Sequence, residues 1–234
     1  EDMRPLINQK ALSEFRARAL SPEHPVARGM AENPETFFAH RESCNPYYDA
    51  VPAIVEKYMN ELSKITGREY KLFTYYGAED ADRVIIAMGS VTEAAREAID
   101  YLNANGQKVG MVSVHLYRPF SIKHLLAAIP QTAKRIAVLD RTKEPGADGE
   151  PLYLDVRSAF YGTDRNPLIV GGRYGLGSAD TTPTMIISVF DNLALPQPKD
   201  HFTLGIVDDV TFTSLPLEEE KALGGEGIFE AKFY

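Results

Sequence analysis

The stretch RVIIAMGSVTEAAREAIDYLNANG, from Arg83 to Gly106, decides the fold. It opens with an unbroken apolar run, Val84 to Ala87, which is typical of a parallel strand covered on both faces. From about Val91, apolar residues recur at spacings of three and four, which predicts a helix with one buried face. Asn105-Gly106 then supplies a left-handed stop. The stretch therefore predicts one parallel strand followed by one helix.

The start of this helix carries a capping-box pattern. Ser90 and Glu93 have the S-x-x-E spacing, in which the hydroxyl accepts from the amide three residues on and the carboxylate returns to the cap amide. Such a cap contributes about 1 kcal/mol. We therefore expect Ser90 to serve the helix as its N-cap.

The same alternation of strand and helix continues toward the C-terminus. Because strands separated by helices pair in parallel, the pattern predicts an α/β fold: a mainly parallel five-stranded sheet with helices on both faces. Residues 70–76, YKLFTYY, are either a further strand or a packed linker. The five strands are expected at 84–87, 108–116, 136–139, 168–170 and 202–207, and the later helices begin after Ser121, near Leu152 and after Thr182.

The N-terminal part is predicted to be helical. One helix is expected from Asn8 to Leu20, followed by an extended connection over 21–38 that holds three prolines. A second helix with an apolar stripe begins near Asn45 and ends at Gly67, and Pro52 inside it predicts a kink or a later start. The predicted domains are 1–67, a helical tail, 68–213, the α/β domain, and 214–234, a linker with the start of a following domain.

Composition limits the classes of function. The chain has 234 residues, a net charge of −8 and no cluster of basic residues, which argues against nucleic acid or a membrane surface as a partner. No run is long enough for a membrane span. The single cysteine, Cys44, excludes an internal disulfide and multi-cysteine metal sites within the chain, and favours a reducing cytoplasm. The chain begins at Glu1 without an initiator, as expected of a piece of a longer protein.

No catalytic pattern is found in the sequence. The five histidines have no metal-ligand spacing, and no G-x-S-x-G elbow is present. Cys44 has no histidine nearer than His40, which favours a buried or partly exposed thiol over a nucleophile. We therefore predict no catalytic residue and no metal ligand in this chain.

One binding hypothesis comes from the loops at the strand ends. In such sheets, ligands bind beyond the carboxyl ends of the strands, where a helix N-terminus and guanidinium groups can hold an anion. Alternatively, the serine only caps its helix and the arginines pair with local carboxylates such as Asp140 and Glu144. The candidate residues for an anion or coenzyme-phosphate site are Ser90, Arg118, Arg141 and Arg173.

Several long and unusual runs carry a family resemblance. They are RALSPEHPVARGMAENPETFF, YYGAEDADRVIIAMGS, LYRPFS, VLDRTKEPGADGEPLYLDV, GGRYGLGS and GEGIFEAKFY. Together they resemble pyruvate:ferredoxin (flavodoxin) oxidoreductase. On that scheme, 1–67 resembles the tail of a first, transketolase-like domain, 68–213 resembles the transketolase C-terminal domain, and the residues after about Gly224 resemble the opening of a third.

The resemblance implies a function for a longer parent protein. The parent oxidatively decarboxylates pyruvate with coenzyme A to acetyl-CoA and reduces ferredoxin or flavodoxin. It uses thiamine diphosphate, Mg²⁺ and [4Fe-4S] clusters, which other parts of the polypeptide hold. No cofactor is implied for this fragment, whose implied partners are the other domains and a second copy in a homodimer. The fragment is thus expected to be a non-catalytic structural domain, with anion binding as the alternative.

Overall fold

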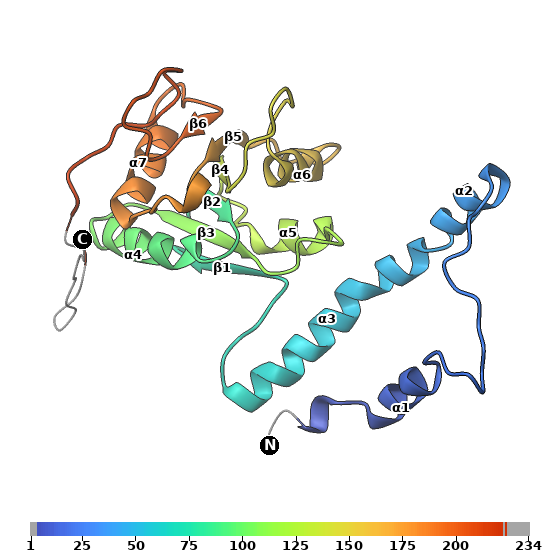
Figure 1. The fold of residues 1–234 in the computed structure, drawn as a ribbon. Helices are drawn as coiled ribbons and strands as arrows, with labels where there is room; N and C mark the ends of the chain where they lie inside the picture. Colours follow the sequence, from blue (N-terminus) through green and yellow to red (C-terminus); the bar gives the residue numbers. More distant parts are fainter. Residues whose placement is uncertain (1–3, 222, 224–234) are drawn as a thin grey trace, which may run out of the picture. The chain divides into compact units, whose positions relative to one another are not determined.

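The computed structural model describes residues 4–221 and 223, and the chain forms two compact units, Glu1–Lys71 and Leu72–Tyr234 (Figure 1). The predicted start of a following domain, after about Gly224, lies outside the described residues. The first unit contains η1 (Arg4–Leu6), α1 (Gln9–Ala17), α2 (Pro34–Glu42) and α3 (Asn45–Thr66). The second contains β1 (Phe73–Gly77), β2 (Arg83–Ala87), α4 (Val91–Ala104), β3 (Val109–Val114), α5 (Ile122–Ala128), β4 (Arg135–Asp140), α6 (Pro151–Phe160), β5 (Leu168–Arg173), η2 (Leu176–Ser178), α7 (Pro183–Ala194) and β6 (Phe202–Thr203).

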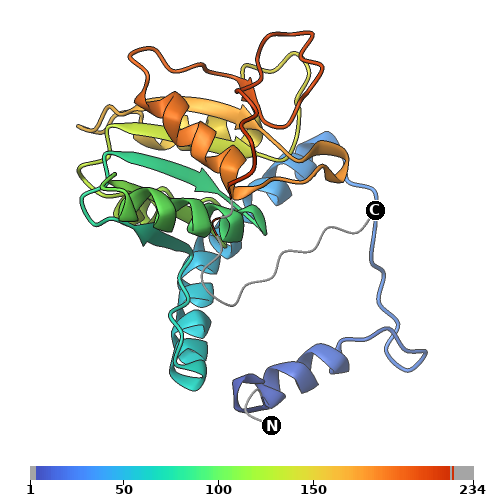
Figure 2. The same cartoon turned by 90° about the vertical axis from the view of Figure 1, so that its left-hand side faces the viewer.

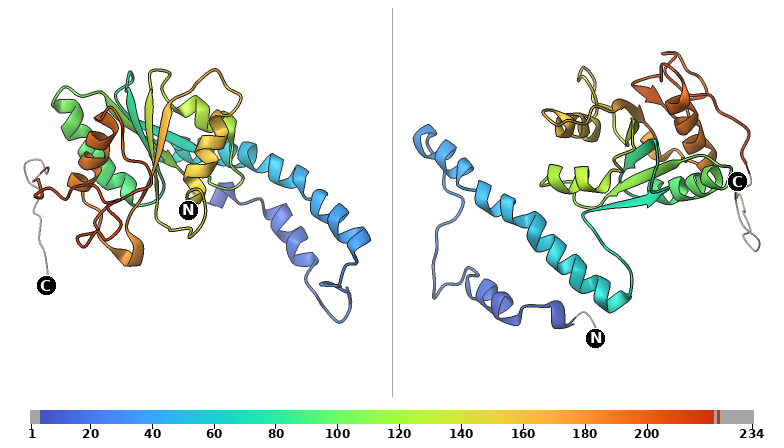
Figure 3. Two further views of the ribbon diagram at one scale, coloured as in Figure 1. Left: turned by 90° about the horizontal axis from the view of Figure 1, so that it is seen from above. Right: turned by 180° about the vertical axis from the view of Figure 1, so that it is seen from behind.

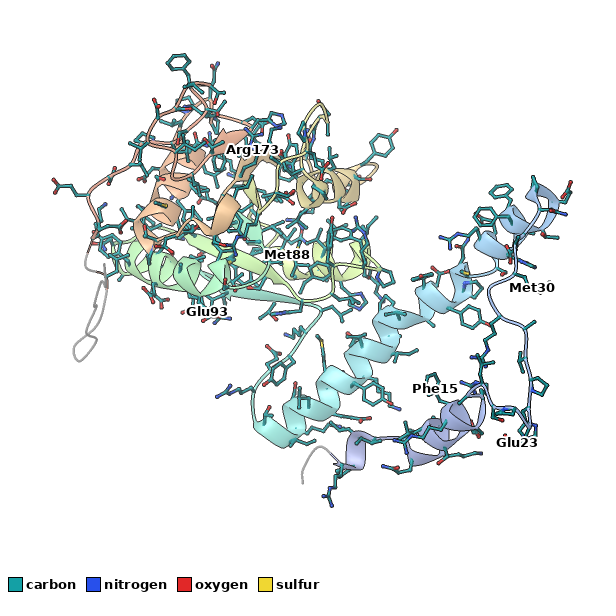
Figure 4. The ribbon with its side chains drawn as sticks, viewed as in Figure 1. Phe15, Glu23, Met30, Met88, Glu93 and Arg173 are labelled. Carbon is teal, nitrogen blue, oxygen red and sulfur yellow. The ribbon has the colours of Figure 1, made fainter. Side chains whose placement is uncertain are left out.

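The helices of the first unit are set by their local caps. The Asn8 side chain accepts a hydrogen bond from the Ala11 amide at 3.0 Å and starts α1. At the other end of the unit, Gly67 adopts φ +70° and ends α3, as the glycine predicted. None of the three α-helices has a buried residue, and Figure 4 shows the side chains of Phe15 and Met30, which are exposed.

Two expectations for this unit were wrong. The predicted extended connection over 21–38 is helical from Pro34 onward, as the start of α2, because Pro34 occupies the first turn of a helix, where its missing amide hydrogen costs nothing. The later start considered for α3 is also wrong. The helix begins at Asn45, with Cys44 as the residue before its first turn, and it runs through Pro52.

The second unit confirms the predicted α/β class. In the described residues its strands form one sheet in the order β1-β3-β2-β4-β5-β6. The pairs β2–β3, β2–β4, β4–β5 and β5–β6 are parallel, and β1 pairs with β3 in antiparallel orientation from Phe73↔Val114 to Gly77↔Gly110. The sheet thus has six strands instead of the predicted five. The aromatic stretch that had been left open supplies the sixth, at an edge.

Helices cover the sheet on two sides. Helices α4 and α7 lie together on one face, and α5 and α6 lie on the other (Figure 3). Figure 2 shows the strands side by side behind α4 and α7. The core beneath this pair includes Ile85, Ile99 and Phe190, all fully buried. Burying such side chains contributes about 1.5–3 kcal/mol each, so this layer holds the unit together.

The predicted capping box is wrong. Ser90 adopts helical dihedral angles, φ −64° and ψ −22°, and its side chain makes no cap hydrogen bond. Glu93 instead lies 3.7 Å from the Arg96 guanidinium. The cap predicted at Thr182 is confirmed, because its hydroxyl accepts from the Met185 amide at 3.3 Å.

The last predicted strand is shorter than expected, and the chain beyond it remains attached to the unit. Strand β6 covers only two residues, and the backbone of Thr203 then pairs with a returning segment, accepting from Leu215 at 2.9 Å and donating to Thr213 at 3.0 Å. Leu215 is buried, and the Lys221 amide donates to the Thr184 hydroxyl at 3.0 Å. The described start of the predicted linker therefore packs against β6 and α7. The predicted domain boundaries themselves stay predictions.

Candidate anion site at the carboxyl ends of the strands

The strand order creates a topological switch point between β2 and β4. The connection from β2 leads through α4 to β3 on one side, while the connection from β4 leads through α6 to β5 on the other. Ligands of doubly wound sheets bind in the crevice at such a point. A cavity of about 360 Å³ lies there, and it is lined by Met88, Gly89, Ser90, Tyr117, Leu139, Asp140, Arg141, Thr142, Pro151 and Tyr174.

Two of the four candidate residues meet in this cavity. Ser90 lies on the loop after β2 and is exposed, with its side chain free of the capping role expected of it. Arg141 follows β4 and donates through Nε to the Gly175 carbonyl at 2.9 Å. Within residues 4–221 and 223, no carboxylate lies within ion-pair distance of the Arg141 guanidinium. Arg141 is therefore the cation at the switch point that has its charge unpaired among the described residues.

The other two candidates are engaged in ion pairs. Arg118 lies 2.7 Å from the Asp155 carboxylate and stacks 3.9 Å above the Tyr117 ring. Arg173 lies 3.4 Å from the carboxylate of Glu150 and donates to the His201 carbonyl at 2.7 Å. Neither arginine lines the switch-point cavity. The alternative proposed from sequence therefore holds for these two, although with carboxylates other than those expected.

Sequence reasoning missed the role of Asp140. Its two carboxylate oxygens accept from the Leu152 and Tyr153 amides, both at 3.0 Å, at the N-terminus of α6. Burial raises the pKa of Asp140, while the two amide hydrogen bonds oppose that rise. The carboxylate fixes α6 against the end of β4, and the helix dipole favours this arrangement. The partner residues lie twelve and thirteen positions away, which is why no capping pattern in the sequence revealed it.

Glu150 was also missed. Its side chain is 2% exposed and faces both Arg173 and, at 3.7 Å, the Lys143 ammonium. The signal in the sequence is the Glu-Pro pair before an apolar helix, which marks a helix start but does not indicate burial.

Tyrosine hydroxyls complete the polar lining. Burial, followed by the hydrogen bond to Asp155, raises the pKa of Tyr117 to about 12, so the phenol stays protonated and donates to that carboxylate at 2.9 Å. Burial likewise raises the pKa of Tyr174, whose hydroxyl donates to the Met88 carbonyl at 3.4 Å. Neither phenol is placed to act as a base. The cavity offers one guanidinium and one serine hydroxyl to an anion, and the Asp140 carboxylate in its lining is already held by two α6 amides.

The described residues contain no group of three or more His, Cys, Asp and Glu side chains placed to hold a metal ion. Cys44 is a free thiol in the first unit, where it donates to the His40 carbonyl at 3.5 Å. Over the same residues, no helix has the length and apolar character needed to cross a bilayer.

The fold and its strand-end loops define an α/β domain of the doubly wound class with an antiparallel edge strand. Comparison with known proteins then identifies its family. Residues 81–186 match the family described as pyruvate:ferredoxin oxidoreductase core domain II, and residues 1–60 match the family described as pyruvate flavodoxin/ferredoxin oxidoreductase, thiamine diP-bdg.

Curated relatives match over the whole chain. The chain is 60% identical to pyruvate-flavodoxin oxidoreductase of Enterobacter agglomerans and 52% identical to pyruvate:ferredoxin oxidoreductase of Moorella thermoacetica, with 100% of this chain and 20% of each relative aligned. The chain belongs to the pyruvate:ferredoxin (flavodoxin) oxidoreductase family and spans about a fifth of the length of these relatives. The resemblance seen in the sequence is thereby confirmed.

Solved structures match this chain too, and one of them carries bound ligands. It is 2-oxoglutarate:ferredoxin oxidoreductase from Magnetococcus marinus, determined with 2-oxoglutarate, coenzyme A and succinyl-CoA bound. It matches 74% of this chain and 28% of its own chain, with a TM-score of 0.45 and 22% identity. A likeness of this size supports no conclusion about function.

Proposed function

We propose that this chain is a non-catalytic structural domain of a pyruvate:ferredoxin (flavodoxin) oxidoreductase and holds the catalytic parts of that enzyme together. The observation that supports this best is that most charged side chains near the strand ends are engaged in structural contacts within the unit. Asp140 caps α6, Arg173 pairs with buried Glu150, and Arg118 pairs with Asp155. These groups hold the α/β unit in one arrangement, and no nucleophile and base lie together among them.

The parent activity is part of the same proposal. Relatives that contain this segment are named pyruvate-flavodoxin and pyruvate:ferredoxin oxidoreductases. The parent then decarboxylates pyruvate with coenzyme A and passes electrons to ferredoxin or flavodoxin, with thiamine diphosphate, Mg²⁺ and [4Fe-4S] clusters supplying the chemistry. We place these cofactors on other parts of the polypeptide, and assign the parent to the cytoplasm as a homodimer.

A direct assay of the chain tests this role. The purified chain is mixed with pyruvate, coenzyme A, thiamine diphosphate and Mg²⁺, and reduction of a dye acceptor is followed. We expect no turnover above the protein-free rate. Circular dichroism and a cooperative urea transition establish that the assayed chain is folded. Pyruvate-dependent dye reduction by the folded chain would contradict the proposal.

The switch-point cavity favours a second candidate function, which is binding of an anion or a coenzyme phosphate. Ser90 and Arg141 both line it, and Arg141 has no carboxylate partner among the described residues. Because a guanidinium recognises phosphate through paired hydrogen bonds, we take Arg141 as the principal contact.

Calorimetry distinguishes this candidate from a purely structural role. Coenzyme A and nucleotides are titrated into the chain and into its Arg141→Ala, Arg118→Ala and Arg173→Ala variants. We expect Arg141→Ala to abolish the binding heat and Arg118→Ala, whose guanidinium lies outside the cavity, to retain it. Absence of heat beyond the salt background in the unmodified chain removes this candidate and leaves the structural role intact.

A further inference from the structure

A second cavity of about 430 Å³ lies beyond the carboxyl ends of β5 and β6. Its walls come from the loop after β4, the turn after β5, the turn after β6 and the returning segment before Leu215. It is lined by Lys143, Arg173, Tyr174, Gly175, Leu176, Ala179, Thr203, Leu204, Gly205, Ile206, Thr211 and Thr213. The cavity is separate from the anion site, since the two share only Tyr174 among their lining residues.

Hydrogen bonds hold these walls in place. The Leu204 amide donates to the Arg173 carbonyl at 2.9 Å, which joins the turns after β5 and β6. The Asp209 carboxylate accepts from the Ser214 amide at 2.8 Å and the Thr213 amide at 3.2 Å, which fixes the outer loop. A site whose walls are tied in this way is largely formed before a ligand arrives, which lowers the cost of binding.

The charges at one end of the cavity do not balance. Lys143 and Arg173 both face the same oxygen of Glu150, at 3.7 Å and 3.4 Å. Two cations and one carboxylate leave a net charge of about +1. The side chain of Lys143 is 44% exposed, so its ammonium can turn toward a ligand, while Arg173, at 12%, stays against Glu150. One further carboxylate, bound at Lys143, would neutralise the remaining positive charge.

The rest of the lining is mainly apolar. Leu204 is 7% exposed, and Leu176 and Ile206 face the same space from neighbouring turns. Thr203 is 8% exposed, and its hydroxyl has no hydrogen-bond partner within the described residues. Buried hydroxyl groups are normally paired, so an unpaired one beside a cavity points to a polar partner that a ligand or water supplies. The volume is at the lower end of the range for ligand pockets.

We propose that this cavity binds a small organic monocarboxylate with a short aliphatic body. The carboxylate lies at Lys143, and the aliphatic body lies against Leu204 and Ile206. A nucleotide does not suit the site, because several phosphate charges would face a single uncompensated cation in an apolar pocket. The proposal is independent of the proposed structural role, since a scaffold domain can carry such a site or lack it.

The test measures binding of butyrate and acetate to the folded chain. Amide chemical shifts are followed by two-dimensional NMR as each salt is added at constant ionic strength. We expect saturable shifts at Leu204 and Gly205, with butyrate binding about tenfold more tightly than acetate because it buries two more methylene groups. Inorganic phosphate, added in the same way, is expected to leave these amides unchanged.

Variants assign the binding energy to particular groups. Lys143→Met keeps the aliphatic stem and removes the charge, and it should weaken butyrate binding at least fivefold. Lys123→Met, at an exposed position of α5, is the matched control and should change nothing. Ile206→Ala should reduce the difference between butyrate and acetate while leaving acetate binding as it is. Arg141→Ala, at the other cavity, should retain full butyrate binding.

Three outcomes overturn the proposal. They are the absence of saturable shifts, equal butyrate affinity in Lys143→Met and the unmodified chain, and a phosphate response equal to that of butyrate. If Lys143→Met does not fold, Ile206→Ala and the chain-length comparison decide the question, because they need no change at the charged group.

Discussion

The two units of the chain have equally clear helical patterns and very different burial. Helix α3 has an apolar stripe over its whole length, yet Ile54, Tyr58 and Ile65 on that stripe are 51%, 42% and 43% exposed. Helix α7 has a stripe of the same kind, and its Val189 and Phe190 are fully buried. Periodicity therefore predicts which face of a helix seeks a partner, but it does not show that the same chain supplies that partner.

The difference has an energetic meaning. A buried large apolar side chain contributes about 1.5–3 kcal/mol relative to an exposed one, and the first unit forgoes that contribution along each of its α-helices. A helix that buries nothing depends on its caps and its intrinsic propensity, which are small terms. The first unit is thus expected to be much less stable than the second. Under the proposed function, other parts of the parent enzyme cover its stripe.

The largest expected effect comes from deleting one phenyl ring in each unit. Phe190→Ala removes a fully buried side chain and should lower the free energy of unfolding by about 3–5 kcal/mol. Phe15→Ala removes a ring that is 68% exposed and should cost less than about 0.5 kcal/mol. Urea unfolding followed by circular dichroism measures both. Equal costs would mean that the first unit has a core of its own.

A pair of glycines gives a smaller contrast. At Gly77, with φ +126°, an added Cβ would meet Gly110 Cα and the Val109 carbonyl, each at 2.5 Å, so Gly77→Ala should cost about 2–4 kcal/mol through strain and loss of the β1–β3 pairing. At Gly67, with φ +70° and open space around it, Gly67→Ala should cost only about 1 kcal/mol.

The readout is again urea unfolding, supported by hydrogen exchange at the amides of β1. If Gly77→Ala cost no more than Gly67→Ala, the edge pairing would not belong to the stable part of the second unit.

The smallest effect concerns pH and Asp140. Because burial raises the pKa of this carboxyl in the folded chain, the folded state binds more protons than the unfolded state between the ordinary value, about 4, and the raised one. The stability that this group contributes therefore falls as pH rises through that window. Asp140→Asn should flatten this dependence and cost about 1–3 kcal/mol at neutral pH, because one of the two α6 amides loses its acceptor.

Unfolding free energies at pH 4, 5, 6 and 7 give the slope for the unmodified chain and for Asp140→Asn. The matched control is Asp164→Asn, at an exposed carboxylate in the loop after α6. An unchanged slope in Asp140→Asn would show that this carboxyl does not couple folding to protons.

Most of the fold could be predicted from the sequence, because the apolar runs of the strands and the three-and-four spacing of the helices depend only on residues close together in the chain. The run from Val84 to Ala87, the stripe of α4 and the Thr182 cap all lie where they were expected. What could not be predicted depends on contacts between distant residues. The sequence leaves residues 70–76 open between a further strand and a packed linker, and only the pairing with β3 makes β1 a strand. The return of Leu215 to β6 has no local signal.

The candidate site was predicted only in part for the same reason. The loops that approach one another follow from the parallel order, and Ser90 and Arg141 do share a cavity. Which arginines are paired depends on Asp155 and Glu150, and their positions in space are set by the packing of α6. Spacing along the chain could not separate the unpaired Arg141 from the paired Arg118.

The sequence by itself determined the alternation of strand and helix, the apolar face of each helix and the family, because these depend on residue type at short spacing. The tertiary structure alone decided the antiparallel edge strand, the capping of α6 by Asp140, and the charge left over at Lys143 and at Arg141. Hydrogen bonds and ion pairs between residues far apart in the chain exist only once the sheet has formed. The strand and helix from Arg83 to Gly106 are thus specified by their local sequence. The contacts available to the loop between them depend on the neighbouring strands.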